Sequence, residues 1–228
     1  MSPQIVKTAD GSDTIYLSEL DETYHSIFGA VQEAKHVFID NGLELIKKDK
    51  FTVLEIGFGT GLNALLTAIF AEKNQKIINY ITIEKFPLEN ELIDQLNYAS
   101  QSNPDVFLFK KIHLAQWEQN VIINDSFEIL KLKTDLIQTE LKIEVAVDIV
   151  FFDAFAPSKQ SEMWDEKIFK ILYETLADNG IFVTYSSAGM VKRALRTSGF
   201  NVKRVKGPPG KHHILIATKE IKSKSIEK

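Results

Sequence analysis

The sequence predicts an α/β fold in which helices cover both faces of a mostly parallel sheet. From about residue 50 onward, apolar runs of strand length alternate with segments of helical spacing. The run Val145–Phe152 is almost wholly apolar, as expected for a strand that is buried on both faces. The last two apolar runs have no helical segment between them, only a loop around Gly207-Pro-Pro-Gly210. We therefore expect them to form an antiparallel pair at one edge of the sheet.

The individual elements are predicted from local composition and from the residues that favour turns. Strands are expected where short runs are rich in β-branched and aromatic residues: Phe51–Ile56, Ile77–Glu84, Phe127–Leu132, Val145–Phe152, Ile181–Tyr185, Asn201–Lys206 and His213–Thr218. Helices are expected where apolar residues recur at helical spacing: Leu62–Glu72, Leu88–Asn97, Glu166–Leu176 and Met190–Thr197. Breaks are expected at Asn103-Pro104, at the turn Asp178-Asn179-Gly180 and at Ser198-Gly199.

The N-terminal residues do not follow this alternation. Turn residues at Ala9-Asp-Gly-Ser12 predict a small hairpin, and helical segments follow it. We expect residues 1–45 to form a cap, residues 46–220 to form the main domain, and residues 221–228 to form a disordered tail.

The composition excludes several classes of site. The 228 residues include no cysteine, so there is no disulfide framework, thiolate zinc site, iron–sulfur cluster or cysteine nucleophile. The five histidines form no H-E-x-x-H pair, and we expect no bound metal. The chain has neither a signal-like start nor an apolar run of about 20 residues. We therefore expect a cytoplasmic protein that does not contact a membrane.

The charge is distributed unevenly along the chain. The net charge is −4, yet residues 190–228 hold 11 Lys and Arg against 2 acids. A basic end on an acidic body indicates an anionic partner, and a nucleic acid is the leading candidate. The alternative is a solvated basic helix followed by a frayed tail.

The strongest motif runs from Leu54 to Asn63 and reads Leu-Glu-Ile-Gly-Phe-Gly-Thr-Gly-Leu-Asn. Glycines permit close approach of a ligand to the backbone, and the helix that follows offers free N–H groups. The spacing fits neither the dinucleotide pattern G-x-G-x-x-G nor a Walker loop. An acid followed by three alternating glycines resembles motif I of class I S-adenosylmethionine-dependent methyltransferases; an ordinary strand-to-helix turn is the alternative.

Two further acids are expected at the same edge of the sheet. Glu84 ends the second strand, where an acid accepts hydrogen bonds from ribose hydroxyls; a surface glutamate is the alternative. A third acid should follow the next strand and hold the adenine amino group. Asp135 is the better placed candidate and Asp125 is its competitor.

Asp153 is the candidate reaction centre. It follows the apolar strand and precedes Ala-Phe155-Ala-Pro157, which puts a carboxylate beside aromatic residues at a strand tip. Such a carboxylate can orient an amine and take up its proton during methyl transfer to nitrogen. Capping of the next helix is the alternative role.

Several stretches together carry a more specific resemblance: Ala9-Asp-Gly-Ser12, Asp21-Glu-Thr-Tyr-His-Ser26, His36-Val-Phe-Ile39, Gly57-Phe-Gly-Thr-Gly-Leu-Asn63, Glu84-Lys-Phe-Pro-Leu88, Phe152-Asp-Ala-Phe-Ala-Pro157 with Met163-Trp164, Ser186-Ser-Ala-Gly189 and Lys206-Gly207. In this order they resemble the methyltransferase domain of the bifunctional tRNA 5-methylaminomethyl-2-thiouridine biosynthesis enzyme, the MnmC type. The resemblance spans nearly the whole chain and is poor around residues 100–130.

The resemblance implies a Rossmann-like class I methyltransferase sheet. It also implies methyl transfer from S-adenosylmethionine to the exocyclic amine of 5-aminomethyl-(2-thio)uridine at the tRNA wobble position, leaving S-adenosylhomocysteine. Asp153 would be catalytic, and Phe155 and Pro157 would shape the uridine pocket. The residues that would hold the cofactor are Glu55, Gly57, Gly59, Gly61, Asn63, Glu84 and Asp135.

The resemblance also suggests partners. Tyr24 is a candidate to close over the site, with a helix cap as the alternative, and phosphates of tRNA would meet Lys192, Arg193, Lys206 and Lys211. The fused form of the family carries a flavin-dependent oxidase domain. No further glycine fingerprint follows here, so we expect no flavin in this chain, a stand-alone methyltransferase, and an oxidase supplied by a separate protein.

Two other functions remain open from the sequence. An aminopropyltransferase of the spermidine-synthase type shares the fold, but usually has an acid inside its glycine loop, where Phe58 and Thr60 stand here. A non-catalytic module that binds the cofactor or RNA is the second alternative, and the intact acids Glu84 and Asp153 argue against it.

Overall fold

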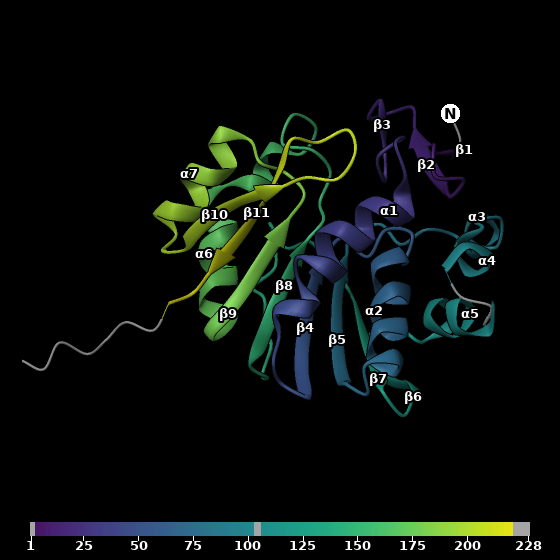
Figure 1. Ribbon diagram of the computed structural model, residues 1–228, viewed down its shortest axis with the longest axis horizontal. Coiled ribbons are helices and arrows are strands. Elements are labelled where there is room, and N and C mark those ends of the chain that lie inside the picture. The colour runs from purple at the N-terminus through teal and green to yellow at the C-terminus, as the bar shows by residue number, and fades with distance from the viewer. Residues whose placement is uncertain (1–2, 103–105, 221–228) are drawn as a thin grey trace, which may run out of the picture.

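The computed structural model describes residues 3–102 and 106–220. Its main sheet contains, in chain order, β4 (Lys50–Ile56), β5 (Ile77–Glu84), β6 (Asn120–Asn124), β7 (Phe127–Lys133), β8 (Val147–Phe152), β9 (Leu176–Thr184), β10 (Asn201–Lys206) and β11 (His213–Thr218). Across the sheet the order is β10-β11-β9-β8-β4-β5-β7-β6 (Figure 1). The central strands β9, β8, β4, β5 and β7 pair in parallel. The mostly parallel sheet predicted from the sequence is therefore confirmed.

Both edges of this sheet are antiparallel. The hairpin of β10 and β11 forms one edge, as predicted, and β11 pairs antiparallel with β9. At the other edge, β6 pairs antiparallel with β7, with a register shift between Ile122 and Asn124. The sequence did not predict β6, because this short edge strand begins and ends with asparagine and carries no clear alternation.

Helices cover both faces of the sheet, which gives three layers (Figure 1). One face is covered by α1 (Ala30–Ala34), a π-helix (Lys35–Asp40), α2 (Leu62–Lys73) and α5 (Val106–Leu114), and the other by α6 (Glu166–Thr175) and α7 (Gly189–Thr197). Strand β8 shows why its sequence is apolar throughout. Phe151 belongs to the core on the first face, and Phe152 belongs to the core on the second.

A second, smaller sheet lies near the N-terminus. It contains β1 (Gln4–Lys7), β2 (Asp13–Leu17) and β3 (Glu22–Thr23), and the first two form the predicted hairpin. Asp10 fixes its turn by accepting hydrogen bonds from Thr8 Oγ1 and from the Ser12 backbone N–H. The same carboxylate accepts the N–H of Gln32, which joins the hairpin to α1. The division into a cap and a main domain stays a prediction.

Two sequence predictions about elements were wrong. The helix expected over Leu88–Asn97 is only α3 (Asn90–Ile93), and α4 (Tyr98–Ser102) begins separately. Asn97 interrupts the helical pattern because its side chain and backbone bond to Gly11 and Asp13 of the hairpin. The turn expected at residues 178–180 lies inside β9, where Asn179 has φ +60° and its N–H bonds to the Lys219 carbonyl.

Two further predicted features fall on residues outside the described ranges. They are the break at Asn103-Pro104 and the tail over 221–228. Within the described ranges, no helix is both long enough and apolar enough to span a bilayer.

Candidate active site

A cavity of about 1260 Å³ lies along the carboxyl ends of β4, β5, β7 and β8. Because these strands are parallel and adjacent, the loops that follow them meet at one edge of the sheet. Residues 16–27, from the N-terminal sheet and the segment after it, line the cavity too. A pocket for one small molecule has a volume of about 300–1000 Å³. This cavity therefore has room for a cofactor and part of a second ligand.

The glycine loop forms part of the cavity wall, and its conformation requires glycine. Gly57, Gly59 and Gly61 all have positive φ, at +95°, +49° and +72°. A Cβ at Gly57 would lie 2.7 Å from the Asp153 carbonyl oxygen, and one at Gly59 would lie 3.0 Å from the Tyr24 ring. Gly57 and Gly59 line the cavity, whereas Gly61 caps α2 behind it. Glycine at these positions therefore lets the loop pack directly against the backbone after β8 and against the Tyr24 ring.

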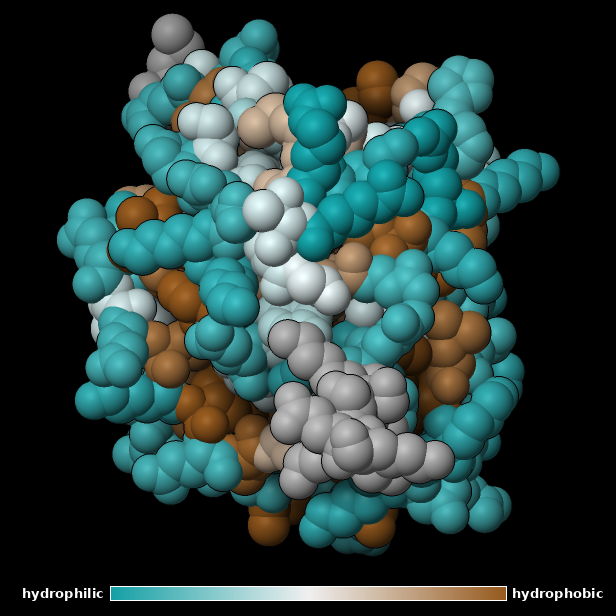
Figure 2. All heavy atoms as spheres, turned by 90° about the vertical axis from the view of Figure 1, so that its left-hand side faces the viewer, coloured by the Kyte–Doolittle hydropathy of each residue, from teal (hydrophilic) through white to brown (hydrophobic). Residues whose placement is uncertain are grey.

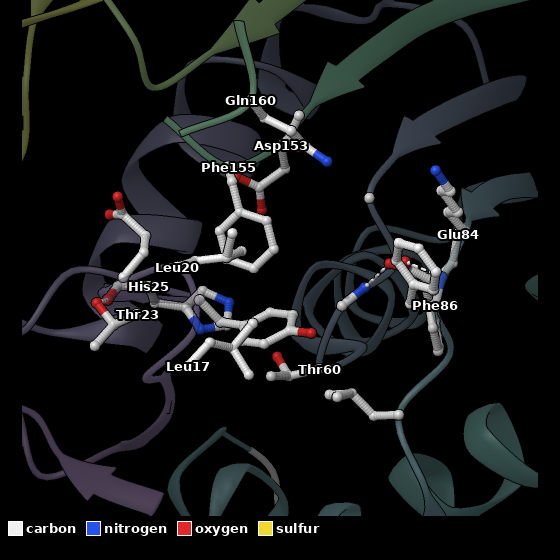
Figure 3. Close-up of a pocket in the computed structure, with 18 of the residues that line it drawn as sticks. Leu17, Leu20, Thr23, His25, Thr60, Glu84, Phe86, Asp153, Phe155 and Gln160 are labelled. Carbon is white, nitrogen blue, oxygen red and sulfur yellow. Dashed lines mark hydrogen bonds between the residues drawn. The ribbon is translucent and has the colours of Figure 1, made fainter. Parts of the chain in front are cut away.

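Glu84 lies across the cavity from Asp153 (Figure 3). Its Oε2 accepts the Gly59 N–H at 3.0 Å, and its Oε1 accepts the Phe86 N–H at 2.8 Å. Burial raises the pKa of this carboxyl group, and the backbone donors oppose that rise. The side chain therefore links the end of β5 to the glycine loop.

The structure separates the two candidates for the third acid. Asp135 follows β7 and lines the cavity; Lys85 Nζ lies 2.9 Å from Asp135 Oδ2 and lowers the pKa of that carboxyl. Asp125 lies in the turn between β6 and β7, at the opposite end of β7. Only Asp135 is placed to meet a ligand in the cavity.

Asp153 follows β8 and its side chain points into the cavity beside Phe155 (Figure 3). Its Oδ2 accepts a hydrogen bond of 2.8 Å from Nδ2 of Asn63, in the first turn of α2. Burial raises the pKa of Asp153 to about 7, and the Asn63 donor opposes the rise. A carboxyl group with this pKa exists in both protonation states near neutral pH, which suits proton transfer.

Aromatic side chains line the cavity next to Asp153. The rings of Tyr24 and Phe155 pack edge to face, with centroids 5.0 Å apart. Trp164 Nε1 donates to the Phe155 carbonyl at 2.7 Å, and the Tyr185 hydroxyl donates to the Ala154 carbonyl at 2.9 Å. These bonds fix the segment after Asp153.

The remaining predicted site residues are not all in the cavity. Among the described residues, Glu55 and Pro157 are not part of the cavity lining, and Glu55 is fully buried in β4. Lys192 and Arg193 lie on α7 and Lys206 lies on β10, all away from the cavity.

Lys211 was predicted to meet phosphates, yet it lines the cavity together with Glu33, which the sequence analysis missed. The two form an ion pair, and Glu33 also accepts the Ser26 N–H at 2.8 Å. The sequence did offer one signal for Glu33, because it is an acid among the small and apolar residues Ala30, Val31 and Ala34, which indicates a buried charge.

Comparison with known proteins identifies the fold and the chemistry. Residues 101–220 match a protein family described as S-adenosyl-L-methionine-dependent methyltransferase. The chain belongs to this family. The glycine loop with positive φ in the cavity wall and the acids that follow β5 and β7 into the cavity fit this cofactor.

Individual relatives match nearly the whole chain. It is 31% identical to the tRNA 5-methylaminomethyl-2-thiouridine biosynthesis bifunctional protein MnmC of Pseudoalteromonas atlantica, over 96% of this chain and 35% of that protein. It is 34% identical to the MnmC of Idiomarina loihiensis, over 82% of this chain and 34% of that protein. The chain therefore spans about a third of the length of these curated relatives. The resemblance to the MnmC type is confirmed.

Among solved structures, the crystal structure of MNMC2 from Aquifex aeolicus aligns with a TM-score of 0.75 at 23% identity. The alignment covers 96% of this chain and 70% of that one. This likeness confirms the predicted Rossmann-like methyltransferase fold.

Proposed function

We propose that the protein methylates the exocyclic amine of 5-aminomethyl-(2-thio)uridine at the wobble position of tRNA. The product is 5-methylaminomethyl-(2-thio)uridine, and S-adenosylhomocysteine is the by-product. The observation that carries the proposal is Asp153, which faces the same cavity as the glycine loop in a chain that aligns over 96% of its length with an MnmC protein. The size of the cavity supports a nucleoside entering beside the cofactor.

The cofactor would be held by the loops at the carboxyl ends of β4, β5 and β7. Gly57 and Gly59 would let it approach the backbone, Glu84 would meet its ribose, and Asp135 would meet its adenine. When bound, S-adenosylmethionine supplies an electrophilic methyl group on its sulfonium sulfur.

Asp153 and the aromatic wall would act on the acceptor. The methyl group moves from sulfur to the amine nitrogen, the carbon–sulfur bond breaks, and one N–H proton is lost. Asp153 is placed to orient the neutral amine and to accept that proton, while alignment of the two reactants supplies most of the acceleration. Phe155 and Tyr24 offer ring faces and edges against which a flipped-out uracil can pack.

A basic surface supports an RNA substrate. It is formed by basic side chains of α7 and β10, namely Lys192, Arg193, Arg196, Arg204 and Lys206, while Lys203 lies on the other face of β10. Within the described part of the chain, none of these five takes part in a salt bridge. Figure 2 looks onto the α7 and β10 side of the molecule, which is covered mainly by hydrophilic residues. Unpaired cations of this kind attract phosphates in a salt-dependent way.

The proposal is tested by the fate of a labelled methyl group. The protein is incubated with radiolabelled S-adenosylmethionine and tRNA that carries 5-aminomethyluridine, and the tRNA is digested to nucleosides. We expect the label in 5-methylaminomethyluridine and none in tRNA with an unmodified wobble uridine. Label in small amines such as putrescine instead would refute the tRNA assignment. A separate flavin-dependent enzyme as partner remains part of the same proposal.

A further inference from the structure

A second buried carboxyl group lies close to Asp153 but outside the cavity. Glu55 is fully buried on β4, and its Oε2 accepts a hydrogen bond of 2.7 Å from Thr82 Oγ1 on β5. Among the described residues, its Oε1 has no hydrogen-bond partner. The reaction proposed above gives this side chain no role, yet a buried carboxyl group is costly to keep in an apolar core.

Asn63 connects the two carboxyl groups. Its Nδ2 donates to Asp153 Oδ2 at 2.8 Å, and its side chain also interacts electrostatically with the Glu55 carboxyl group. Within the described ranges, the buried Asn63 Oδ1 has no partner either. The orientation of this amide decides whether an N–H donor or a carbonyl acceptor faces Asp153.

The surroundings of Glu55 favour its neutral form. Its titratable neighbours are Tyr80 and Asp153, and no described lysine, arginine or histidine forms a salt bridge with it. Burial raises the pKa of Glu55 to about 8; the Asp153 charge adds to this rise, and hydrogen bonds from Thr82, Asn63 and Tyr80 oppose it. An ionised Glu55 could accept from the Tyr80 hydroxyl as well as from Thr82, but it would leave the buried Asn63 Oδ1 without a donor. A protonated one brings a donor for Asn63 Oδ1 or the Tyr80 hydroxyl.

We propose that Glu55 is a positioning residue that acts as a neutral carboxylic acid and holds the Asn63 amide with its N–H group toward Asp153. One Asp153 oxygen is thereby fixed, and the other remains available to the acceptor amine. The kinetic part of this proposal depends on the proposed function, because it assumes that Asp153 acts in methyl transfer. The protonation state of Glu55 does not depend on it.

The first test measures that protonation state directly. Protein labelled with ¹³C at the glutamate side-chain carboxyl is titrated by NMR, and the Glu55 signal is assigned as the one missing in Glu55→Gln. We expect this carboxyl group to remain protonated at pH 7 and to titrate near pH 8. A Glu55 carboxyl that is already ionised at pH 6 would overturn the proposal, whether or not the enzyme acts on tRNA.

The second test compares two variants of similar side-chain volume. Glu55→Leu removes all hydrogen bonding, and we expect kcat to fall about tenfold, the worth of roughly one hydrogen bond, with little change in KM for the cofactor. Glu55→Gln keeps a neutral donor, and we expect it to restore most of that rate. Equal losses of kcat in both variants would refute a role for the neutral acid.

The pH profile separates positioning from simple packing. The charged or titratable groups that interact with Asp153 are Glu33, Lys211, Tyr80, Tyr185 and Glu55 itself, and the two variants change only Glu55. In Glu55→Leu the Asn63 donor is no longer held, so the pH midpoint of kcat should rise, whereas Glu55→Gln should keep the wild-type midpoint. A lower midpoint in Glu55→Gln would show that the wild-type side chain is ionised and would overturn the proposal.

Discussion

Lys211 and Glu33 form an ion pair in the cavity wall, although 178 positions separate them in the chain. Glu33 comes from α1 and Lys211 from the loop between β10 and β11, so the pair joins the N-terminal segment to the C-terminal hairpin. The Lys211 ammonium group also lies 4.2 Å from the centre of the Tyr185 ring. The Glu33 side chain is only 9% exposed, so its charge depends on this partner.

Removing Lys211 alone should therefore lower the free energy of unfolding more than replacing both members of the pair. We expect Lys211→Ala to lower the free energy of unfolding by about 1–3 kcal/mol, because a buried carboxylate loses its donor. Adding Glu33→Gln should recover part of that loss. Urea unfolding of the wild type, both single variants and the double variant measures the difference. Additive losses in the double variant would contradict a coupled pair.

The raised pKa of Asp153 predicts a pH-dependent rate. Because that pKa is about 7 and the carboxylate is the form that orients the amine, kcat for methyl transfer should rise through pH 7 and then level off. Steady-state rates measured from pH 5 to 9 would show this. A rate that is flat across pH 6–8 would argue against ionisation of Asp153 as a requirement.

The same raised pKa has a consequence for stability. Between pH 3.8 and about 7 the folded protein keeps a proton on Asp153 that the unfolded chain has released. Asp153 therefore lowers the free energy of unfolding as pH increases across this window. Asp153→Asn should remove that part of the slope, and urea titrations at several pH values test it.

Gly57 should tolerate no side chain. Its φ of +95° and the 2.7 Å approach of a Cβ to the Asp153 carbonyl oxygen both penalise alanine. We expect Gly57→Ala to lose about 1–3 kcal/mol of stability and to bind S-adenosylmethionine more weakly. Gly189→Ala is the matched control, because its Cβ would meet only the flexible Arg193 side chain at 3.6 Å. Calorimetric titration compares the affinities of the two variants for S-adenosylmethionine, and urea unfolding compares their stabilities. Equal losses in both variants would contradict a steric requirement for glycine at position 57.

The basic surface should govern affinity for tRNA and leave cofactor binding unchanged. We expect Arg204→Glu to weaken tRNA binding and to make the dependence of log Kd on log salt shallower by about one unit per lost phosphate contact. Lys73→Glu, an exposed position on α2, supplies a control with the same type of charge change. If the control weakened binding as much, the surface on α7 and β10 would not be the tRNA contact.

The sequence was most informative where local chemistry alone determines structure. The strand before Gly57, the strand ending at Glu84 and the hairpin of β10 and β11 were predicted with nearly their observed bounds. Glycine spacing, apolar runs and turn residues are local signals, and tertiary contacts reinforce them here.

What the sequence could not give depends on contacts between distant segments. Asn97 ends a helical pattern because the hairpin of the N-terminal sheet binds it, and Lys211 faces the cavity because Glu33 attracts it there. Likewise, the motif placed Glu55 beside the cofactor, whereas the strand alternation turns its side chain into the core. Neither the partners nor the orientation of such side chains can be predicted until the arrangement of the helices and strands is known.

The most direct test of the account is methyl transfer by the wild type and Asp153→Asn, measured side by side with their affinities for S-adenosylmethionine. Both proteins receive labelled cofactor and tRNA that carries 5-aminomethyluridine. We predict label in 5-methylaminomethyluridine with the wild type, and a rate at least about 100-fold lower in the variant at nearly unchanged cofactor affinity. A variant that transfers the label as fast as the wild type would contradict the role of Asp153. No label in this nucleoside from a wild type that binds the cofactor would contradict the substrate.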